Sequence, residues 1–265
     1  MKIKEIVSAL ERFAPLPLQD GFDNAGLQIG LTEVEATGAL LCLDVTEAVL
    51  DEAIALGYNL VISHHPLIFK GYKSITGKDY VERCILKAIK NDIVIYSAHT
   101  NLDNAYGGVN YKIAEKIGLK NLQVLEPKEN SLQDDLMQAG AGIVGELDEP
   151  ETELEFLKRI KKTFEVGCVR HNRLTGREIQ KVALCGGAGA FLLPQAIRAG
   201  ADVFITGEIK YHDYFGHEGD ILMAEIGHYE SEQYTKEIFY SIIRDLFPNF
   251  ALQSSKINTN PIKYL

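Results

Sequence analysis

The alternation of strand-like and helix-like segments is the sequence feature that most limits what this chain can fold into. Short apolar runs rich in β-branched residues, such as Leu-Val-Ile-Ser at 60–63, alternate with longer segments whose apolar residues recur at helical spacing. This alternation predicts an α/β fold with a largely parallel sheet and crossover helices. The expected strands are 38–45, 60–63, 93–98, 142–147, 181–185, 202–206 and 221–226. The expected helices are 46–56, 80–90, 107–117, 152–164, a helix ending at 199, and 231–247.

The two halves of the sequence resemble each other, which predicts a duplicated unit. A shift of 143 positions aligns 53–57 with 196–200 and 60–63 with 203–206. A shift of 129 positions aligns His99 with His228 and Asp103 with Glu232. All βα units look somewhat alike, but the matching His-x-x-x-carboxylate units favour true duplication. We therefore expect mixed, mostly parallel sheets in two intertwined α/β lobes, 1–123 and 124–265, with the final helix packing back on the first lobe and no inserted middle domain.

Composition and charge exclude several classes of protein. The 265 residues include 27 basic and 37 acidic side chains, a net charge of −10 without a cluster of Lys or Arg, so we expect no broad nucleic-acid surface. No apolar run approaches the roughly 18 residues that a membrane span needs, and the first residues lack the apolar block of a signal peptide. The four cysteines are widely separated, which is typical of a cytoplasmic protein without a disulfide framework or a thiolate zinc site.

Imidazoles and carboxylates gather where the expected strands end, which is where open α/β sheets bind ligands. His64 and His65 follow one strand, and Asp103 follows the next strand along the chain. His228 and Glu232 follow the last strand at i, i+4 spacing, so a helix that begins near His228 would present both side chains on one face. Metal ligation explains such a gathering, because neutral imidazole and carboxylate hold borderline divalent ions.

The number of candidate ligands favours two metal ions over one. Adjacent side chains diverge, so His64 and His65 more naturally bind two different ions than chelate one. Five protein ligands exceed the three of an open catalytic zinc site and suit a dinuclear centre in which Glu232 bridges the ions. We expect two divalent ions per chain, of zinc, manganese or iron. A His-His pair alone often only caps a strand, whereas the whole five-residue set is hard to explain without a metal.

Several neighbouring residues keep open roles on sequence alone. His99 is interpreted as a group that supports the ligands, a proton shuttle or a structural polar residue, and Glu208 as a substrate contact or an ion-pair partner. His212 follows Glu208 at i+4 and could line the same cleft. Gly186-Gly187-Ala188-Gly189 follows a strand and is either a phosphate cradle or a tight turn. No Gly-x-Ser-x-Gly motif or reactive cysteine context is present, so the catalytic residues stay unknown.

Five motifs together resemble the signature blocks of the Nif-three-like family, whose members are often named GTP cyclohydrolase I type 2 homologues. The motifs are Phe22-Asp23-Asn24-Ala25-Gly26-Leu27-Gln28, Ser63-His64-His65-Pro66-Leu67, His99-Thr100-Asn101-Leu102-Asp103, Thr206-Gly207-Glu208, and Gly227-His228-Tyr229 with Glu232. The resemblance implies a two-lobed fold of duplicated units, a dinuclear metal centre between the lobes, and a toroidal homohexamer. It further implies that one metal takes His64 and Asp103, that the other takes His65 and His228, and that Glu232 touches both.

The family name implies hydrolytic opening of the purine ring of GTP. We therefore expect a metal-dependent hydrolase that acts on a nucleotide-like small molecule, although the sequence shows no dedicated guanine pocket and no basic phosphate clamp beyond the glycine turn. The alternatives are a metal-handling or metal-insertion protein, in which the two ions are cargo, and a scaffold that binds protein partners. An enzyme would retain its metal and turn over substrate, whereas a carrier would release its ions to an acceptor.

Overall fold

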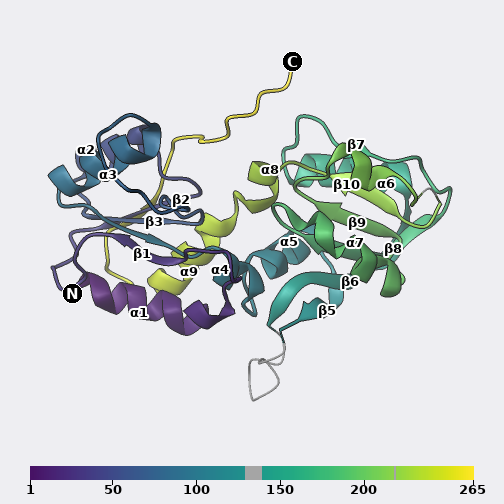
Figure 1. The fold of residues 1–265 in the computed structure, drawn as a ribbon. Coiled ribbons are helices and arrows are strands. Elements are labelled where there is room, and N and C mark those ends of the chain that lie inside the picture. The colour runs from purple at the N-terminus through teal and green to yellow at the C-terminus, as the bar shows by residue number, and fades with distance from the viewer. Residues whose placement is uncertain (129–138, 218) are drawn as a thin grey trace. The chain divides into compact units, whose positions relative to one another are not determined.

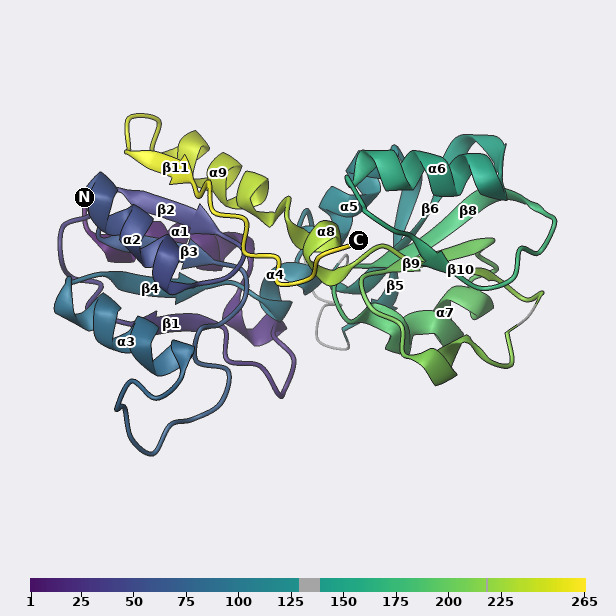
Figure 2. The same cartoon turned by 90° about the horizontal axis from the view of Figure 1, so that it is seen from above.

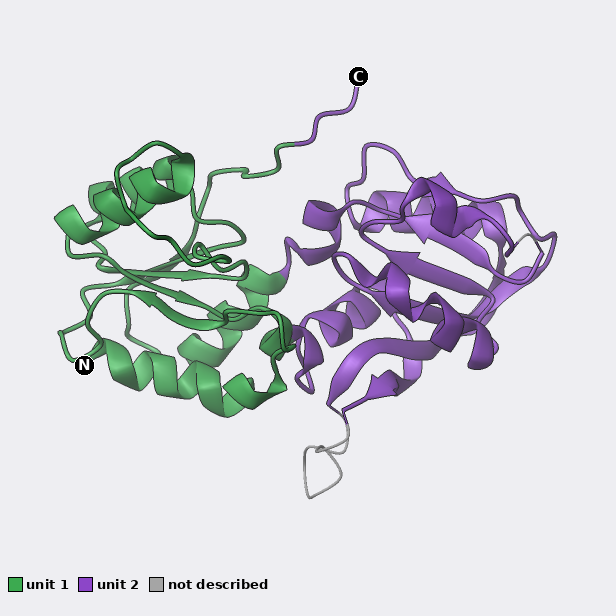
Figure 3. Ribbon diagram, viewed as in Figure 1, with its two compact units in different colours: residues 1–102, 235–261 green, residues 103–234, 262–265 purple. Residues whose placement is uncertain are grey.

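The computed structural model describes residues 1–128, 139–217 and 219–265, which form two compact units. Unit 1 comprises residues 1–102 and 235–261, and unit 2 comprises residues 103–234 and 262–265 (Figure 3). The chain therefore leaves unit 1 after Leu102, returns to it at Thr235 and ends in unit 2. Both units combine helices with a mixed sheet, as the alternating sequence pattern predicts.

Unit 1 is built around a sheet that has, within the described residues, five strands in the order β1-β4-β3-β2-β11 (Figure 1). Strands β2, β3, β4 and β11 run parallel, whereas β1 pairs antiparallel with β4. Helices α2 and α3 lie on one face of this sheet, and α1 and α9 lie on the other (Figures 1 and 2). The elements are α1 (Ile3–Phe13), η1 (Leu16–Leu18), β1 (Gly26–Ile29), β2 (Ala39–Cys42), α2 (Glu47–Leu56), β3 (Leu60–Ser63), α3 (Tyr80–Lys90), β4 (Val94–Ser97), α9 (Thr235–Leu246) and β11 (Leu252–Ser254).

Local sequence signals set both ends of helix α2. The Thr46 side chain accepts a hydrogen bond from the Val49 amide at the start of α2, and Gly57 ends that helix in the left-handed conformation, with φ 69°. Strands β2, β3 and β4 are buried along their whole length, since helices cover both faces of the sheet. This burial explains why their sequences are continuously apolar instead of alternating.

Unit 2 contains a sheet that has, within the described residues, six strands in the order β5-β6-β8-β9-β10-β7. Strands β8, β9 and β10 are parallel, and the remaining pairs are antiparallel. Helices α5 and α6 cover one face, and α7 covers the other (Figure 2). The elements are α5 (Val109–Ile117), β5 (Lys120–Pro127), β6 (Gly140–Thr152), α6 (Glu153–Thr163), β7 (Arg170–His171), β8 (Glu178–Cys185), η4 (Gly189–Leu192), α7 (Leu193–Arg198), β9 (Val203–Thr206), η5 (Tyr211–Tyr214), β10 (Leu222–Glu225) and α8 (His228–Glu232).

One expected helix, 231–247, is wrong in its extent. The structure has two helices here, α8 and α9, separated by Gln233 and Tyr234. The Gln233 side chain donates to the Phe164 carbonyl at 3.2 Å, and the Tyr234 hydroxyl donates to the Thr163 carbonyl at 3.0 Å. These tertiary contacts hold the break at the point where the chain passes from unit 2 to unit 1. The helical periodicity continues across the break and so could not reveal it.

Among the described residues, no helix is both long and apolar enough to cross a membrane. In the polar stretch 124–180, the expected strand and the expected helix correspond to β6 and α6, while residues 129–138 lie outside the described residues.

Candidate metal centre

Unit 1 presents two adjacent imidazoles where β3 ends. The Nδ1 atom of His64 lies 2.9 Å from the carbonyl oxygen of Ala98, and Nδ1 of His65 lies 2.7 Å from Oδ1 of Asp44. A carbonyl oxygen only accepts, so Nδ1 of His64 donates, and the neutral ring carries its lone pair on Nε2. His64 is fully buried, and its ring and that of His65 are tilted by 49°. Metal-ligating histidines are typically fixed in this way by an oxygen on the second ring nitrogen.

Asp44 fixes His65 and was missed by the sequence analysis. Its Oδ2 atom also accepts a hydrogen bond of 2.5 Å from the Thr259 hydroxyl. Burial is the largest single effect and raises the pKa of Asp44, but the hydrogen bonds from His65 and Thr259, together with the interactions with the His65 and His64 charges, lower it overall. The expected strand 38–45 included Asp44, whereas β2 ends at Cys42, so Asp44 lies beyond the strand end. The other candidates were chosen because they follow the end of an expected strand. Asp44 would have met the same criterion if the expected strand had ended at residue 43.

A third imidazole, His99, joins this group just before α4 (Thr100–Asn104), which contains the boundary between the units. Its Nδ1 lies 2.7 Å from Oδ1 of Asp23, while the amide and hydroxyl of Thr100 donate to Oδ2 of the same carboxylate. Burial raises the pKa of Asp23, but the hydrogen bonds have the larger combined effect and lower the pKa to about 2. One ring nitrogen from each of His64, His65 and His99 lies within 4.8 Å of the others, so this cluster could hold a metal ion.

Unit 2 gathers the remaining candidate ligands around Glu232. Helix α8 begins at His228, as the i, i+4 argument requires. Nε2 of His228 lies 3.1 Å from Oε2 of Glu232, and Nδ1 of His228 lies 2.8 Å from Oε1 of Glu208. A carboxylate oxygen of Asp103 lies within 4.8 Å of one of Glu232. Glu232 is only 3% exposed and adjoins both Asp103 and His228, which is the arrangement a bridging carboxylate needs.

The glycine turn at 186–189 is a tight turn and not a phosphate cradle. The Gly186 amide donates to the Asn110 side chain, the Gly187 amide to the Ser231 hydroxyl, and the Gly189 amide to the Thr206 hydroxyl. These three amides therefore do not point at a ligand. Gly187 has a φ of 59°, and a Cβ there would lie 2.3 Å from Oε1 of Glu232. Glycine is required because the turn passes directly against this carboxylate.

The structure thus brings the predicted site residues together in two groups. His64 and His65 form one group in unit 1, with His99 beside them. Asp103, His228 and Glu232 form the other group in unit 2, with Glu208 hydrogen bonded to His228. Glu208 thus contacts His228, and both Glu208 and His212 line a cavity of unit 2.

Comparison with known proteins agrees with the resemblance drawn from the motifs. Residues 1–261 match the family described as Duf34/NIF3 (NGG1p interacting factor 3). A Clostridium perfringens protein named GTP cyclohydrolase 1 type 2 homolog is 38% identical over 88% of this chain and 87% of its own length. A Lactococcus lactis protein of the same name is 34% identical over 98% of each chain. The crystal structure of the Staphylococcus aureus hypothetical protein SA1388 is 32% identical, covers 100% of this chain and 99% of its own, and has a TM-score of 0.90.

Proposed function

Since the chain belongs to the Duf34/NIF3 family, we propose that it is a metal-dependent hydrolase that binds two divalent ions and acts on a nucleotide-like small molecule. One observation carries this proposal. In each of His64, His65, His99 and His228, Nδ1 is hydrogen bonded to a carbonyl or carboxylate oxygen, which leaves Nε2 as the ring nitrogen that can bind a metal or transfer a proton. Metal ligands and proton-transfer groups depend on such a fixed ring, and in three of the four histidines the oxygen belongs to a carboxylate, of Asp44, Asp23 or Glu208.

We assign one ion to His64 and Asp103, the other to His65 and His228, and Glu232 to both. The close approach of Glu232 to Asp103 and to His228 supports a bridging role, and the separate anchors of His64 and His65 support ligation of different ions. This mixture of imidazole and carboxylate suits zinc, manganese or iron. When bound, two such ions would supply activation of water and polarisation of the bond to be broken.

His99 is assigned to proton transfer at Nε2. The Asp23 carboxylate accepts from Nδ1 of His99 and stays ionised because of its low pKa, so it holds the ring in one orientation. The ring centroid of His99 lies 5.3 Å from that of His64 and 5.5 Å from that of His65, close enough to exchange a proton with a molecule bound beside them. The name of the relatives, GTP cyclohydrolase 1 type 2 homolog, supports a purine nucleotide as the substrate class.

Metal counting on purified variants tests the ligand assignment. Wild-type protein should contain close to two divalent ions per chain, and Glu232→Ala should lose affinity for both. His65→Ala should weaken mainly one ion, because the other keeps most of its ligands. Lys158→Gln, on the exposed face of α6, serves as the matched control and should bind like wild type. Undiminished binding of both ions by Glu232→Ala would disprove the bridging assignment.

Turnover assays on the same preparations test the hydrolase. Zinc-, manganese- and iron-loaded protein should hydrolyse GTP or another member of a nucleotide panel. His99→Asn should keep both ions and lose most of the turnover, since its substituted side chain cannot move the proton. Loss of metal from His99→Asn would make His99 a ligand instead. Wild-type protein that hydrolyses no nucleotide but transfers its ions to a metal-free acceptor would replace the hydrolase with a metal carrier.

A further inference from the structure

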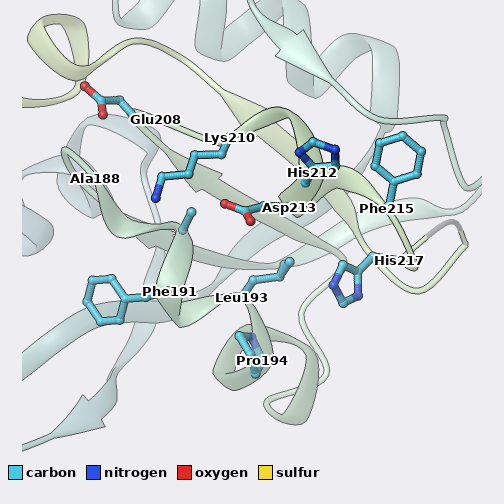
Figure 4. Close-up of a pocket in the computed structure, with 11 residues that line it drawn as sticks. Ala188, Phe191, Leu193, Pro194, Glu208, Lys210, His212, Asp213, Phe215 and His217 are labelled. Atoms are coloured by element: carbon cyan, nitrogen blue, oxygen red, sulfur yellow. The ribbon is translucent and has the colours of Figure 1, made fainter.

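Unit 2 contains a cavity of about 610 Å³ that the proposed metal ligands do not line. One side of the cavity comes from η4 and the start of α7, and the other side comes from residues 208–217, which follow β9 (Figure 4). Its volume lies in the range of pockets that bind small molecules. The cavity is thus large enough for a ligand of the size of a nucleotide base with its sugar.

Exposed aromatic rings bound this cavity. Phe191 is 59% exposed and Phe215 is 56% exposed, and the Tyr211 ring lies beside Phe215 with a centroid separation of 5.4 Å. Figure 4 shows Phe191 and Phe215 at opposite ends of the cavity, with Lys210 and Asp213 between them. Large aromatic side chains gathered on a concave surface indicate a partner with a flat apolar face, because their exposure to water is unfavourable.

The polar groups of the cavity indicate a ligand that has both hydrogen-bond donors and negative charge. The Lys210 ammonium forms no ion pair with any residue that the structure describes. Lys210 lines the cavity together with Ala188, Phe191 and Asp213 (Figure 4). The ammonium can receive an anionic group, and the carboxylate can accept from ring N–H or amino groups. The amides of Gly186, Gly187 and Gly189 are already bonded, and Lys210 is the lining residue that offers a permanent positive charge.

Glu208 connects this cavity to the candidate metal centre. Its carboxylate lines the cavity and also accepts the hydrogen bond from Nδ1 of His228, at 2.8 Å. The glycine turn separates the two regions, since Gly187 lies against Glu232 while the neighbouring Ala188 faces the cavity. A molecule held in the cavity therefore lies one hydrogen bond away from a proposed metal ligand.

We infer that this cavity binds the base and the anionic arm of a nucleotide. Phe215 packs against the base at one end of the cavity and Phe191 packs against the sugar at the other end. Asp213 accepts from the N–H groups of the base, and Lys210 contacts the phosphate. The inference takes the substrate class from the proposed function, but the site itself rests on the cavity, its aromatic rings and a lysine that forms no ion pair with the described residues.

Equilibrium binding of GMP and guanosine tests the site without turnover. The measurement uses full-length protein stripped of metal by a chelator, so that phosphate cannot bind to metal ions. Phe215→Ala should weaken GMP and guanosine about tenfold, since aromatic stacking is worth about 1–3 kcal/mol per base, and Phe191→Ala should weaken both probes as well, through the lost contact with the sugar. Lys210→Gln should weaken GMP about tenfold and leave guanosine unchanged, because only GMP carries the phosphate. Leu154→Ala, a similarly exposed apolar side chain on α6, and Lys158→Gln are the controls and should bind like wild type.

The outcomes separate this inference from the proposed function. If wild-type protein binds GMP through these residues but hydrolyses no nucleotide, the binding site is supported and the proposed hydrolase function is contradicted. Active protein whose affinity for GMP is unaffected by Phe191→Ala and Phe215→Ala overturns the site and leaves the hydrolase standing. Unchanged GMP binding together with a smaller mass by light scattering in those variants would also overturn it, because the rings would then belong to a contact between copies of the chain. Failure of metal-free wild type to bind either probe overturns it outright.

Discussion

Placing a single methyl group at Gly187 tests whether the Glu232 carboxylate belongs to a metal centre. The Cβ of Gly187→Ala would lie 2.3 Å from Oε1 of Glu232, 3.2 Å from its Cδ and 3.3 Å from Nε2 of His228. Glu232 is 3% exposed, so its carboxylate cannot move into solvent to relieve the contact. The carboxylate must instead shift within the site by several tenths of an ångström.

The matched control is Gly200→Ala, which shares the backbone cost but not the contact. Gly200 has a φ of 70°, close to the 59° of Gly187, and a Cβ there meets nothing within 4 Å. The left-handed conformation costs an L-residue about 1–2 kcal/mol, so both variants should lose that much unfolding free energy when measured without metal. Only Gly187→Ala should also lose metal affinity. Displacing a ligand or its support typically costs about 10- to 100-fold in affinity, which is the loss we expect.

Competition with a chromophoric chelator for zinc or manganese measures the affinities, and urea unfolding in excess chelator measures the backbone cost. We expect Gly200→Ala to bind metal like wild type despite its lower stability. Equal metal affinities for Gly187→Ala and Gly200→Ala would refute the reasoning, because a displaced Glu232 would then be irrelevant to the ions. Equal losses in both variants would refute it too, by tracing the effect to stability alone.

Three further predictions follow from the same residues and from the family. Metal occupancy should fall as pH drops from about 7 to about 5, because imidazole ligates only when neutral and a free histidine side chain titrates at about pH 6.5. Constant occupancy would contradict histidine ligation. The pKa of Asp23 is lowered from 3.8 to about 2 in the folded protein, so the ionised carboxylate adds about 2 kcal/mol to the free energy of unfolding. This contribution is complete above about pH 4 and is lost as the pH falls through 2. Urea unfolding of metal-free protein should therefore show Asp23→Asn less stable than wild type near neutral pH, with the difference closing in acid; a gap independent of pH would contradict the assignment. Light scattering should give six times the 29.4 kDa mass of the chain, and a monomer would contradict the hexamer that the resemblance implies.

The sequence predicts the central strands of both sheets because burial on two faces makes them continuously apolar. Edge strands carry no such signal: β5 is mostly exposed, and β1, β7 and β11 have only two to four residues each. The pairing partners of β1, β7 and β11 also lie far along the chain, so no local pattern reveals these three strands. The break between α8 and α9 could not be predicted for a related reason, since contacts with the carbonyl groups of residues 163 and 164 hold it in place.

The candidate ligands were predictable because the residue type and the strand end suffice to select them. Their hydrogen-bond partners were not, since each partner is defined only by folding. Asp44 meets His65 across 21 positions, and Asp23 meets His99 across 76. Asp23 did fall within a motif of the resemblance, but its contact with His99 could not be read from the motif. The glycine turn was ambiguous for the same reason, because the side chains that occupy its amides come from distant segments.

Strand register gives a separate measure of the duplication. Cys42 pairs with Ser63 in one sheet and Cys185 pairs with Thr206 in the other, so these strands correspond under the predicted shift of 143. In the next pairs, Ser63 with Ser97 and Thr206 with Glu225, the first members still correspond under the shift of 143. The second members, Ser97 and Glu225, correspond under a shift of 128, one less than the shift that aligns the histidines.

The second half therefore has one more residue between strand and histidine. As a result His228 is the first residue of α8, while His99 precedes α4. His228 meets the carboxylate four residues later, at 3.1 Å, whereas His99 bonds to Asp23 from a different segment. Equivalent positions in the two halves have thus acquired different partners. This difference is the physical reason to assign His228 to a metal and His99 to proton transfer, although the repeat alone would give them one role.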